Sequence, residues 1–544
     1  EVRDLTVDAG ATAEFQEVLK INGDITNNGS IVFKSITETQ TGILDEVPAT
    51  SIISGSGTFT SERYIPDSNR AFRFLSSSIT TTSTIRDNWQ EGVNNTGITS
   101  SDNLNPSPGY GIHITGSQTG ANGFDATPTG NASMFIFDNV TQTWAAVSNT
   151  NSNTITAGIP YRVYVRGGRD IDVTDNGSSP TPTTLRTTGD IVTGTVTMND
   201  LSGFANNFNF IGNPYQAPVN IGQVIGNSTN INMNQYYIWD PNLGTQGAYV
   251  TVSLLDGTNS SGSDANIFIQ PGQAVFVTTA TTTSTTSVVF EESYKGNQSD
   301  LTETFKLSNN NLNIIGQLYT QEAFNNGGNL HDSFRIRFSN NYSNSLELND
   351  AIKPFNIDEN MGIKNGNELF SIESRNLPVD NEEIQLFNNN YRTENYVLSL
   401  EIDDFNDVEV YLKDNYTQQT TLLESGINNI SFSVDLNDQS SDENRFSIVF
   451  SEDNLNSESN TLDALAIYPN PLNNGSLFVR LPNHTNSNLE VTAYNMLGQK
   501  IYSASKESIN SKIEIKNATT WKNGVYIISI NDGTKTVTRK IVKN

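Results

Sequence analysis

Residues 524–542 read GVYIISINDGTKTVTRKIV and carry the clearest local signal in the chain. Two runs rich in β-branched and aromatic residues flank the polar turn Asn531-Asp532-Gly533. Asp-Gly between such runs is a strong signal for a tight β-hairpin, because glycine readily adopts the positive φ that the turn requires. The stretch therefore predicts two antiparallel strands at the end of the chain.

A similar rhythm extends through the rest of the sequence. Clusters of Asn, Thr and Ser recur roughly every 8–12 residues between short runs of Val, Ile, Phe and Tyr, a spacing typical of sandwiches and barrels. Helical apolar spacing is nowhere sustained, and the nearest candidate, residues 461–467, ends just before Pro469. We therefore predict an all-β, multidomain protein, in which 544 residues correspond to about three to five domains.

Composition excludes several classes of function. The chain has 31 Lys+Arg against 59 Asp+Glu, a formal net charge of −28, and no cysteine. The negative charge disfavours nucleic acid and anionic lipid as partners, and the lack of cysteine excludes disulfides, Cys-zinc sites and thiol nucleophiles.

No run approaches the ~18 apolar residues of a membrane span, so we expect no transmembrane segment. The start at Glu1, without Met or an apolar leader, is expected either of a secreted protein after signal removal or of a fragment.

Residues 1–60 contain short apolar strands about ten residues apart, each followed by a turn of small residues. This spacing predicts the rungs of a β-solenoid, whose few coils would need a cap or further coils to bury their apolar face. A few strands that lead into the next domain are an equally good interpretation.

Two larger β-regions follow. Residues 61–298 contain repeated Gly/Pro turns that feed alternating strands, which predicts a β-sandwich or jelly-roll-like domain. A Thr/Ser-rich stretch ends this region, and residues 299–452 again alternate at period two, which predicts a second β-sandwich. Residues 453–463 are almost entirely polar and are interpreted as a linker.

Residues 464–544 differ from the rest in charge: they hold 10 Lys+Arg and 4 Asp+Glu, so the tail is +6 and the remainder −34. Such an asymmetry suggests a module with a separate task. Its motifs are Tyr-Pro-Asn-Pro at 468–471, Met-Leu-Gly at 496–498, Gly-Val-Tyr at 524–526 and the final basic strand. We expect Lys535, Arg539, Lys540 and Lys543 to form a basic edge that could dock on an acidic surface or discourage unwanted strand pairing.

These motifs, in this order and spacing, resemble the C-terminal sorting domain of type IX secretion cargo, of the type A kind, in Bacteroidetes. The resemblance implies an immunoglobulin-like sandwich of seven strands, recognition by the outer-membrane translocon and its cargo shuttle, and an extracellular location on the cell surface or in the medium. In this family the sorting domain is commonly removed by a protease. The residues that carry the resemblance are Tyr468, Pro469, Asn470, Pro471, Leu497, Gly498, Gly524, Tyr526, Arg539 and Lys540. More weakly, segments of residues 61–452 resemble large flavobacterial surface proteins.

Motifs for catalysis are missing from the sequence. The three histidines, His113, His331 and His484, lie in different predicted domains, and no nucleophile elbow, phosphate loop or zinc-protease motif occurs. The carboxylate pairs Asp403-Asp404 and Glu382-Glu383 are neighbours along predicted strands, so each pair points to opposite faces. We therefore predict that the protein is not an enzyme.

An acidic segment offers the best candidate for a metal. Asp170, Asp172 and Asp175 supply closely spaced oxygen ligands before Gly177, as calcium prefers, although the order of an EF-hand is not followed. The alternative is a solvated acidic loop. No other cofactor is expected.

Aromatic residues in the 61–298 region offer a candidate for ligand stacking. Exposed aromatic rings on a β-sandwich could stack on sugar rings, whereas burial in the core is the default for such side chains. The candidates are Trp89, Trp144, Tyr236, Tyr237 and Trp239.

Together these features predict an exported surface protein with a structural or adhesin-like role. The alternatives are an accessory protein that binds polysaccharide or an abiotic surface, and a polysaccharide hydrolase with two dispersed carboxylates.

Overall fold

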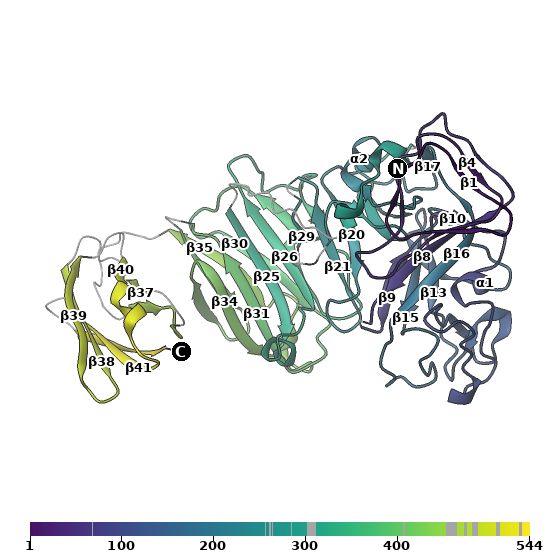
Figure 1. The fold of residues 1–544 in the computed structure, drawn as a ribbon. Helices are drawn as coiled ribbons and strands as arrows, with labels where there is room; N and C mark the ends of the chain where they lie inside the picture. The colour runs from purple at the N-terminus through teal and green to yellow at the C-terminus, as the bar shows by residue number, and fades with distance from the viewer. Residues whose placement is uncertain are drawn as a thin grey trace. The chain divides into compact units, whose positions relative to one another are not determined.

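A computed structural model describes residues 1–67, 69–255, 257–260, 263, 265–283, 285–301, 312–405, 408–452, 465–472, 476–480, 488–507, 512–531 and 536–543. The fold is 46% strand and 7% helix, which confirms the all-β, multidomain prediction. The chain forms two compact units, Glu1–Glu452 and Asp453–Asn544 (Figure 1). The predicted linker at 453–463 lies outside the described residues.

The first unit begins with a β-solenoid of parallel strands. Its sides are formed by β1 (Leu5–Val7), β4 (Ile25–Asn27) and β7 (Ile53–Ser54); by β2 (Thr12–Phe15), β5 (Ser30–Phe33) and β8 (Thr58–Ile65); and by β3 (Val18–Leu19) and β6 (Ile43–Leu44). Leu5 pairs with Ile25, and Ile25 with Ile53, so the coils are 20 and 28 residues long. The solenoid prediction is confirmed with one correction. Strands ten residues apart are successive sides of one coil, because each coil turns through several sides before it returns to register.

The strand β8 closes the solenoid. One edge of β8 pairs in parallel with β5, and the other pairs antiparallel with β16 (Thr183–Ile191), which is followed by β10 (Ile79–Thr80). This provides the cap that a short solenoid needs to cover its apolar face. The predicted boundary at residues 60 and 61 falls inside β8, which the two regions share.

Two four-stranded sheets enclose an aromatic core in the next region. One sheet has the order β14 (Thr143–Ala146), β13 (Met134–Asp138), β15 (Tyr161–Val165) and β9 (Ala71–Leu75). The other has the order β18 (Phe208–Gly212), β23 (Ala274–Thr278), β20 (Gln235–Asp240) and β21 (Ala248–Ser253). Rings from both sheets meet: Phe74 lies 4.8 Å from Phe210, which lies 4.6 Å from Phe276 between ring centroids. Aromatic packing of this kind stabilises the pairing of the two sheets.

Short elements complete this region. The helices are α1 (Ile85–Trp89) and α2 (Ile221–Gly226), with 3-10 turns at Ser100–Asp102, Ala121–Gly123, Glu292–Tyr294 and Gln298–Leu301. The paired short strands are β11 (Thr115–Ser117) with β12 (Asp125–Ala126), β17 (Val196–Met198) with β24 (Val288–Phe290), and β19 (Val219–Asn220) with β22 (Phe268–Ile269).

Residues 312–452 form one curled sheet of eleven strands. The strands run in the order β33 (Gln419–Leu423), β32 (Val408–Asp414), β35 (Phe446–Glu452), β30 (Glu383–Asn389), β28 (Asn360–Asn365), β29 (Glu368–Arg375), β26 (Asp332–Phe338), β25 (Leu312–Thr320), β31 (Asn395–Ile402) and β34 (Gly426–Ser433), with β27 (Ala351–Ile352) on β29. Phe338 of β26 and Phe450 of β35 are 5.6 Å apart between ring centroids, so the sheet folds over itself around one core. This confirms a second sandwich. Helix α3 (Gln321–Asn325) and a 3-10 turn at Gln439–Ser441 lie in its connections.

The curled sheet packs on the two four-stranded sheets that enclose the aromatic core. Ala351 and Ile372 belong to the same buried cluster as Phe74 and Trp239. The hydroxyls of Thr251 and Ser371 are 2.6 Å apart and buried. Residues 1–452 are therefore one compact unit, within which the predicted boundary near residue 299 lies.

The second unit is a seven-stranded sandwich, as predicted. One sheet has the order β36 (Ala466–Tyr468), β37 (Leu477–Arg480) and β40 (Lys512–Ile515). The other has the order β39 (Lys500–Glu507), β38 (Asn488–Asn495), β41 (Gly524–Asn531) and β42 (Thr536–Lys543). A 3-10 turn occupies Lys516–Thr520. Strands β41 and β42 pair antiparallel, with Asn531 opposite Thr536, which confirms the predicted hairpin. Residues 532 and 533 of its turn lie outside the described residues.

Candidate functional site

The Tyr-Pro-Asn-Pro motif closes one edge of the second unit. The Asn470 amide donates a hydrogen bond to the Lys540 carbonyl at 3.1 Å and accepts one from the Val542 amide at 2.9 Å. Leu472 then donates its backbone N–H to the Val542 carbonyl at 2.7 Å. Because proline has no N–H, the flanking residues Pro469 and Pro471 cannot donate to a strand. The Asn470 side-chain amide therefore forms the hydrogen bonds that the backbone of a neighbouring strand would form, and it covers this part of the edge of β42.

Tyr468 packs beside this edge. Its ring stacks on Phe478 of the neighbouring strand, with centroids 5.7 Å apart. The Lys512 ammonium lies 4.4 Å from the Phe478 centroid and 5.6 Å from that of Tyr468. Cations favour such positions over aromatic rings, so the motif also fixes a positive charge on the surface of the unit.

The Met-Leu-Gly motif is a tight turn that exposes two apolar side chains. The Asn495 side-chain oxygen accepts hydrogen bonds from the backbone of Leu497 and Gln499, both at 3.0 Å. Gly498 has φ of +76°, a left-handed conformation that favours glycine. Met496 and Leu497 are 68% and 83% exposed, so this turn offers an apolar contact to a partner.

Gly524 and Tyr526 lie at the start of β41. Gly524 pairs with Lys543 of β42. Tyr526 is buried, its hydroxyl donates to the Lys522 carbonyl at 2.5 Å, and its ring lies 4.9 Å from that of Trp521. Tyr526 therefore acts in folding and not in direct recognition.

The basic strand is only partly an exposed edge. Arg539 is half-buried and Lys540 is exposed. Lys543 corrects the prediction: it is buried, and its ammonium donates to the carbonyls of Ala518 and Thr519 at 2.7 and 2.9 Å. Its role is to hold the end of a 3-10 turn, where helical carbonyls need donors from outside the helix. Lys535 lies outside the described residues.

Four of the five aromatic candidates for ligand stacking are buried, which corrects that prediction. Trp89 is 1% exposed, and its indole donates to the Thr187 hydroxyl at 3.0 Å. Tyr236, Tyr237 and Trp239 are 0%, 0% and 5% exposed. The alternation of side chains along β20 does not distinguish a buried face from an exposed one, because both faces of this strand are covered. These rings belong to the core and are not available to a ligand.

Trp144 is half-buried and is the one candidate with part of its surface free. The Arg162 guanidinium lies 4.0 Å from its ring centroid, and the Phe137 ring lies 5.0 Å away. Part of this indole is thus already in contact with side chains of the protein.

The predicted calcium ligands do not converge. Asp170 accepts from the Thr181 hydroxyl at 2.6 Å, Asp172 from the Thr174 hydroxyl at 2.6 Å, and Asp175 from the Gly177 amide at 2.8 Å. Across the described ranges, no group of three His, Asp or Glu side chains could hold a metal ion. The geometry gives the calcium prediction no support, because each carboxylate is used to shape its own loop.

Sequence reasoning missed a buried ion cluster around Asp125. Its carboxylate accepts from both ends of the Arg169 guanidinium at 2.9 and 3.0 Å, and His113 Nδ1 lies 3.3 Å away. Burial favours the neutral acid, but the contacts with His113 and Arg169 outweigh it and hold the Asp125 pKa below its usual range. Because Arg169 also donates to the carbonyls of Leu104 and Ile112, the cluster ties three loops together. Its partners are 44 residues apart, and no motif marks them.

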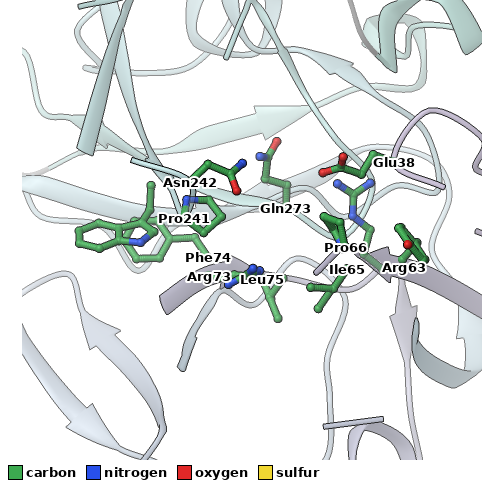
Figure 2. Close-up of a pocket in the computed structure, with 13 residues that line it drawn as sticks. Glu38, Arg63, Ile65, Pro66, Arg73, Phe74, Leu75, Pro241, Asn242 and Gln273 are labelled. Carbon is green, nitrogen blue, oxygen red and sulfur yellow. The ribbon is translucent and has the colours of Figure 1, made fainter. Parts of the chain in front are cut away.

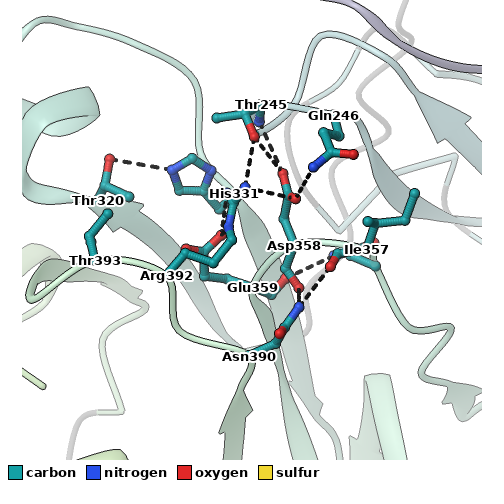
Figure 3. Close-up of polar contacts among 12 residues, drawn as sticks. Thr245, Gln246, Thr320, His331, Ile357, Asp358, Glu359, Asn390, Arg392 and Thr393 are labelled. Atoms are coloured by element: carbon teal, nitrogen blue, oxygen red, sulfur yellow. Dashed lines mark hydrogen bonds and ion pairs between the residues drawn. The ribbon is translucent and has the colours of Figure 1, made fainter. Parts of the chain in front are cut away.

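A second polar cluster surrounds Glu359 in the curled sheet (Figure 3). Its carboxylate accepts from Arg392 at 2.8 Å and from the Tyr396 hydroxyl at 2.9 Å. Burial raises the Glu359 pKa, but the Arg392 contact outweighs it, so the pKa is lower than usual. Burial also lowers the His331 pKa and favours the neutral imidazole. Asp358 binds Arg392 at 2.9 Å, so these acids are paired within the protein.

Among the described residues, no helix combines the length and the apolar character that crossing a membrane requires.

Comparison with known proteins identifies the second unit. Residues 466–544 match the family of the secretion system C-terminal sorting domain. No curated protein matches the chain. Solved structures with partial similarity include a Faecalibacterium prausnitzii beta-glucuronidase (10% identity, 28% of this chain and 37% of that one, TM-score 0.12) and dimeric latent PorU from Porphyromonas gingivalis (11% identity, 47% and 31%, TM-score 0.15).

The chain spans only about a third of the length of these solved proteins, and at such TM-scores the likeness establishes neither a shared fold nor an activity. The family match is specific to the second unit, where the motifs described above form its edges and turns. The chain is therefore cargo of the type IX secretion system, exported across the outer membrane to the cell surface or the medium.

Proposed function

We propose that residues 1–452 are a non-enzymatic β-scaffold with a structural or adhesin-like role, which the sorting domain delivers to the cell surface or the medium. The observation that carries this proposal is the pairing of three of its buried acids with basic side chains. Asp125 is bound by Arg169, Glu359 by Arg392, and Asp332 by Lys353 at 2.6 Å. A catalytic acid or base must exchange a proton with substrate, whereas these carboxylates are committed to partners inside the fold.

The test combines turnover and adhesion. The purified full chain is incubated with a panel of polysaccharides and its products are followed by reducing-end release. In parallel, its retention on bacterial and abiotic surfaces is measured. We expect retention without turnover. Release of sugar by the pure protein would overturn the proposal, as would failure to be retained on any surface.

We infer further that the outer-membrane translocon and its cargo shuttle contact residues 464–544, and that the source is a member of the Bacteroidetes, of flavobacterial type. The exposed Met496, Leu497 and Lys540 support the contact with the machinery, since they leave apolar and cationic groups free for a partner. The source is inferred only from the resemblance of the motifs to sorting domains of that group. Capture of the shuttle by the full chain, and its loss on substitution of Leu497, would test it.

A second candidate function is binding of a polysaccharide. The buried aromatics give it no support, but a cavity of mixed polarity in the first unit favours it (Figure 2). Retention of the full chain on an insoluble glycan, released by the soluble form of the same glycan, would test this function independently of where the ligand binds.

A further inference from the structure

A cavity of about 150 Å³ opens where the solenoid meets the aromatic sheets. Arg63 at the end of β8, Arg73 on β9 and Gln273 before β23 line it, with Glu38 from a solenoid loop at its mouth (Figure 2). A single water needs about 10–15 Å³ measured in this way, so the cavity has room for a small organic group.

Arg63 lines this cavity with an unused hydrogen-bond donor. Its Nη1 is buried without a hydrogen-bond partner, and the part of the chain that the structure describes offers its guanidinium no hydrogen bond or ion pair. Burial lowers the Arg63 pKa, and the more distant Glu38 opposes this only in part. Arg63 as a whole is half-buried, but its Nη1 is shielded from water and has no acceptor. Because a shielded donor without a partner is costly, an anion that accepts from Nη1 would be stabilised.

Arg73 adds a second guanidinium to the same lining. It is 8% exposed, and its Nη1 donates to the Ala71 carbonyl at 3.2 Å. Burial lowers its pKa to about 10, against the influence of Asp240 and Glu38. Asp240 is already engaged, since it accepts from the Ser263 hydroxyl at 2.5 Å. Two guanidinium groups in one lining supply N–H donors of the kind that bind carboxylates.

The other groups of the lining suit a sugar ring. Glu38 is exposed and accepts hydrogen bonds, as hydroxyl donors require. The side-chain amides of Asn242 and Gln273 face the cavity in Figure 2, beside the ring of Pro241. The Glu38 carboxylate disfavours a phosphate or sulfate dianion and tolerates a monoanion whose hydroxyls reach it.

We propose that this cavity binds a sugar residue that carries a carboxylate, a hexuronate of an acidic polysaccharide, with the carboxylate on Arg63 and Arg73 and hydroxyls toward Glu38. The proposal rests on the second candidate function and names its ligand class and its site.

The experiment is calorimetric titration of the full chain with D-glucuronate and D-galacturonate, with D-glucose, D-galactose and acetate as comparison ligands. We expect saturable binding of at least one uronate, with the neutral sugars and acetate at least tenfold weaker. Arg63→Gln should weaken uronate binding at least tenfold, the effect of losing a hydrogen bond to a charged group. Arg3→Gln is the matched control, since it removes the same formal charge at an 89% exposed side chain.

Glu38→Gln guards against a folding defect in Arg63→Gln, because Glu38 is exposed and its replacement leaves the core intact. It should weaken uronate binding, because the sugar hydroxyls lose a charged acceptor, and should not weaken acetate binding, because acetate has no hydroxyl to make that contact. Absence of uronate binding, equal affinity for acetate or neutral sugar, or unchanged uronate affinity in both pocket variants would overturn the proposal. Retention on an insoluble glycan that survives both variants would overturn this site while leaving polysaccharide binding in place.

Discussion

Replacement of Asn470 by alanine tests whether the Tyr-Pro-Asn-Pro motif acts by closing a strand edge. The change removes the hydrogen bonds to Lys540 and Val542, at 3.1 and 2.9 Å. Each is worth roughly 0.5–1.5 kcal/mol net, and both lie near solvent, so the expected loss is about 1–2 kcal/mol. For a unit of this size that corresponds to a fall in Tm of roughly 4–16 °C.

The assay is thermal unfolding of the full chain, with hydrogen exchange at the Val542 amide as a local readout. The transition of the second unit should move, while that of residues 1–452 should not. Asn470→Asp keeps the acceptor for Val542 and loses the donor to Lys540, so it should fall between wild type and alanine. The matched control is Asn523→Ala, an exposed asparagine of the same unit.

A change below about 0.5 kcal/mol in Asn470→Ala, or unchanged exchange at Val542, would refute the edge-closing role. Leu497→Ala separates folding from recognition in the same experiment. Its side chain is 83% exposed, so the Tm should stay constant while export from a host with type IX machinery falls.

Three further predictions concern charge. Lys543→Met should destabilise the second unit in chemical unfolding, because the Ala518 and Thr519 carbonyls lose the Lys543 donor. Lys540→Gln should leave stability unchanged, and equal effects would contradict the assignment. Lys353→Met should cost about 3–5 kcal/mol in urea unfolding, since it strands the buried Asp332 carboxylate, and the added change Asp332→Asn should restore part of this. Burial raises the Asp350 pKa to about 6, so its contribution to stability is present below about pH 4 and is lost as pH rises through 6. The stability of wild type relative to Asp350→Asn should therefore fall by about 2 kcal/mol between pH 4 and 7, and a flat difference would refute this.

Local patterns were enough to predict the secondary structure. The Asp-Gly turn predicted the β41–β42 hairpin, and recurrent short strands predicted the solenoid. The length of a solenoid coil was not predictable, because successive sides and successive coils produce the same strand-and-turn pattern. Only the pairing of Leu5 with Ile25 shows that a coil takes 20 residues.

The polar clusters escaped prediction for a different reason. Asp125 meets Arg169 across 44 residues, and Arg63 and Arg73 share one cavity only because β8 and β9 both line it. Such contacts depend on how sheets stack, which is not encoded in the spacing along one strand. Lys543 was misjudged for the same reason: a lysine on an edge strand is normally solvated, and only the position of the 3-10 turn buries it.

The sorting motif therefore combines residues with two different tasks. The side chains of Asn470 and Tyr526 form hydrogen bonds to partners inside the unit. The side chains of Leu497 and Lys540 are exposed to solvent. A substitution in the first pair lowers export by unfolding the unit, and one in the second pair lowers it without unfolding. Loss of export alone consequently does not identify a contact with the secretion machinery. A motif residue counts as part of the recognition surface only when its replacement lowers export at constant Tm.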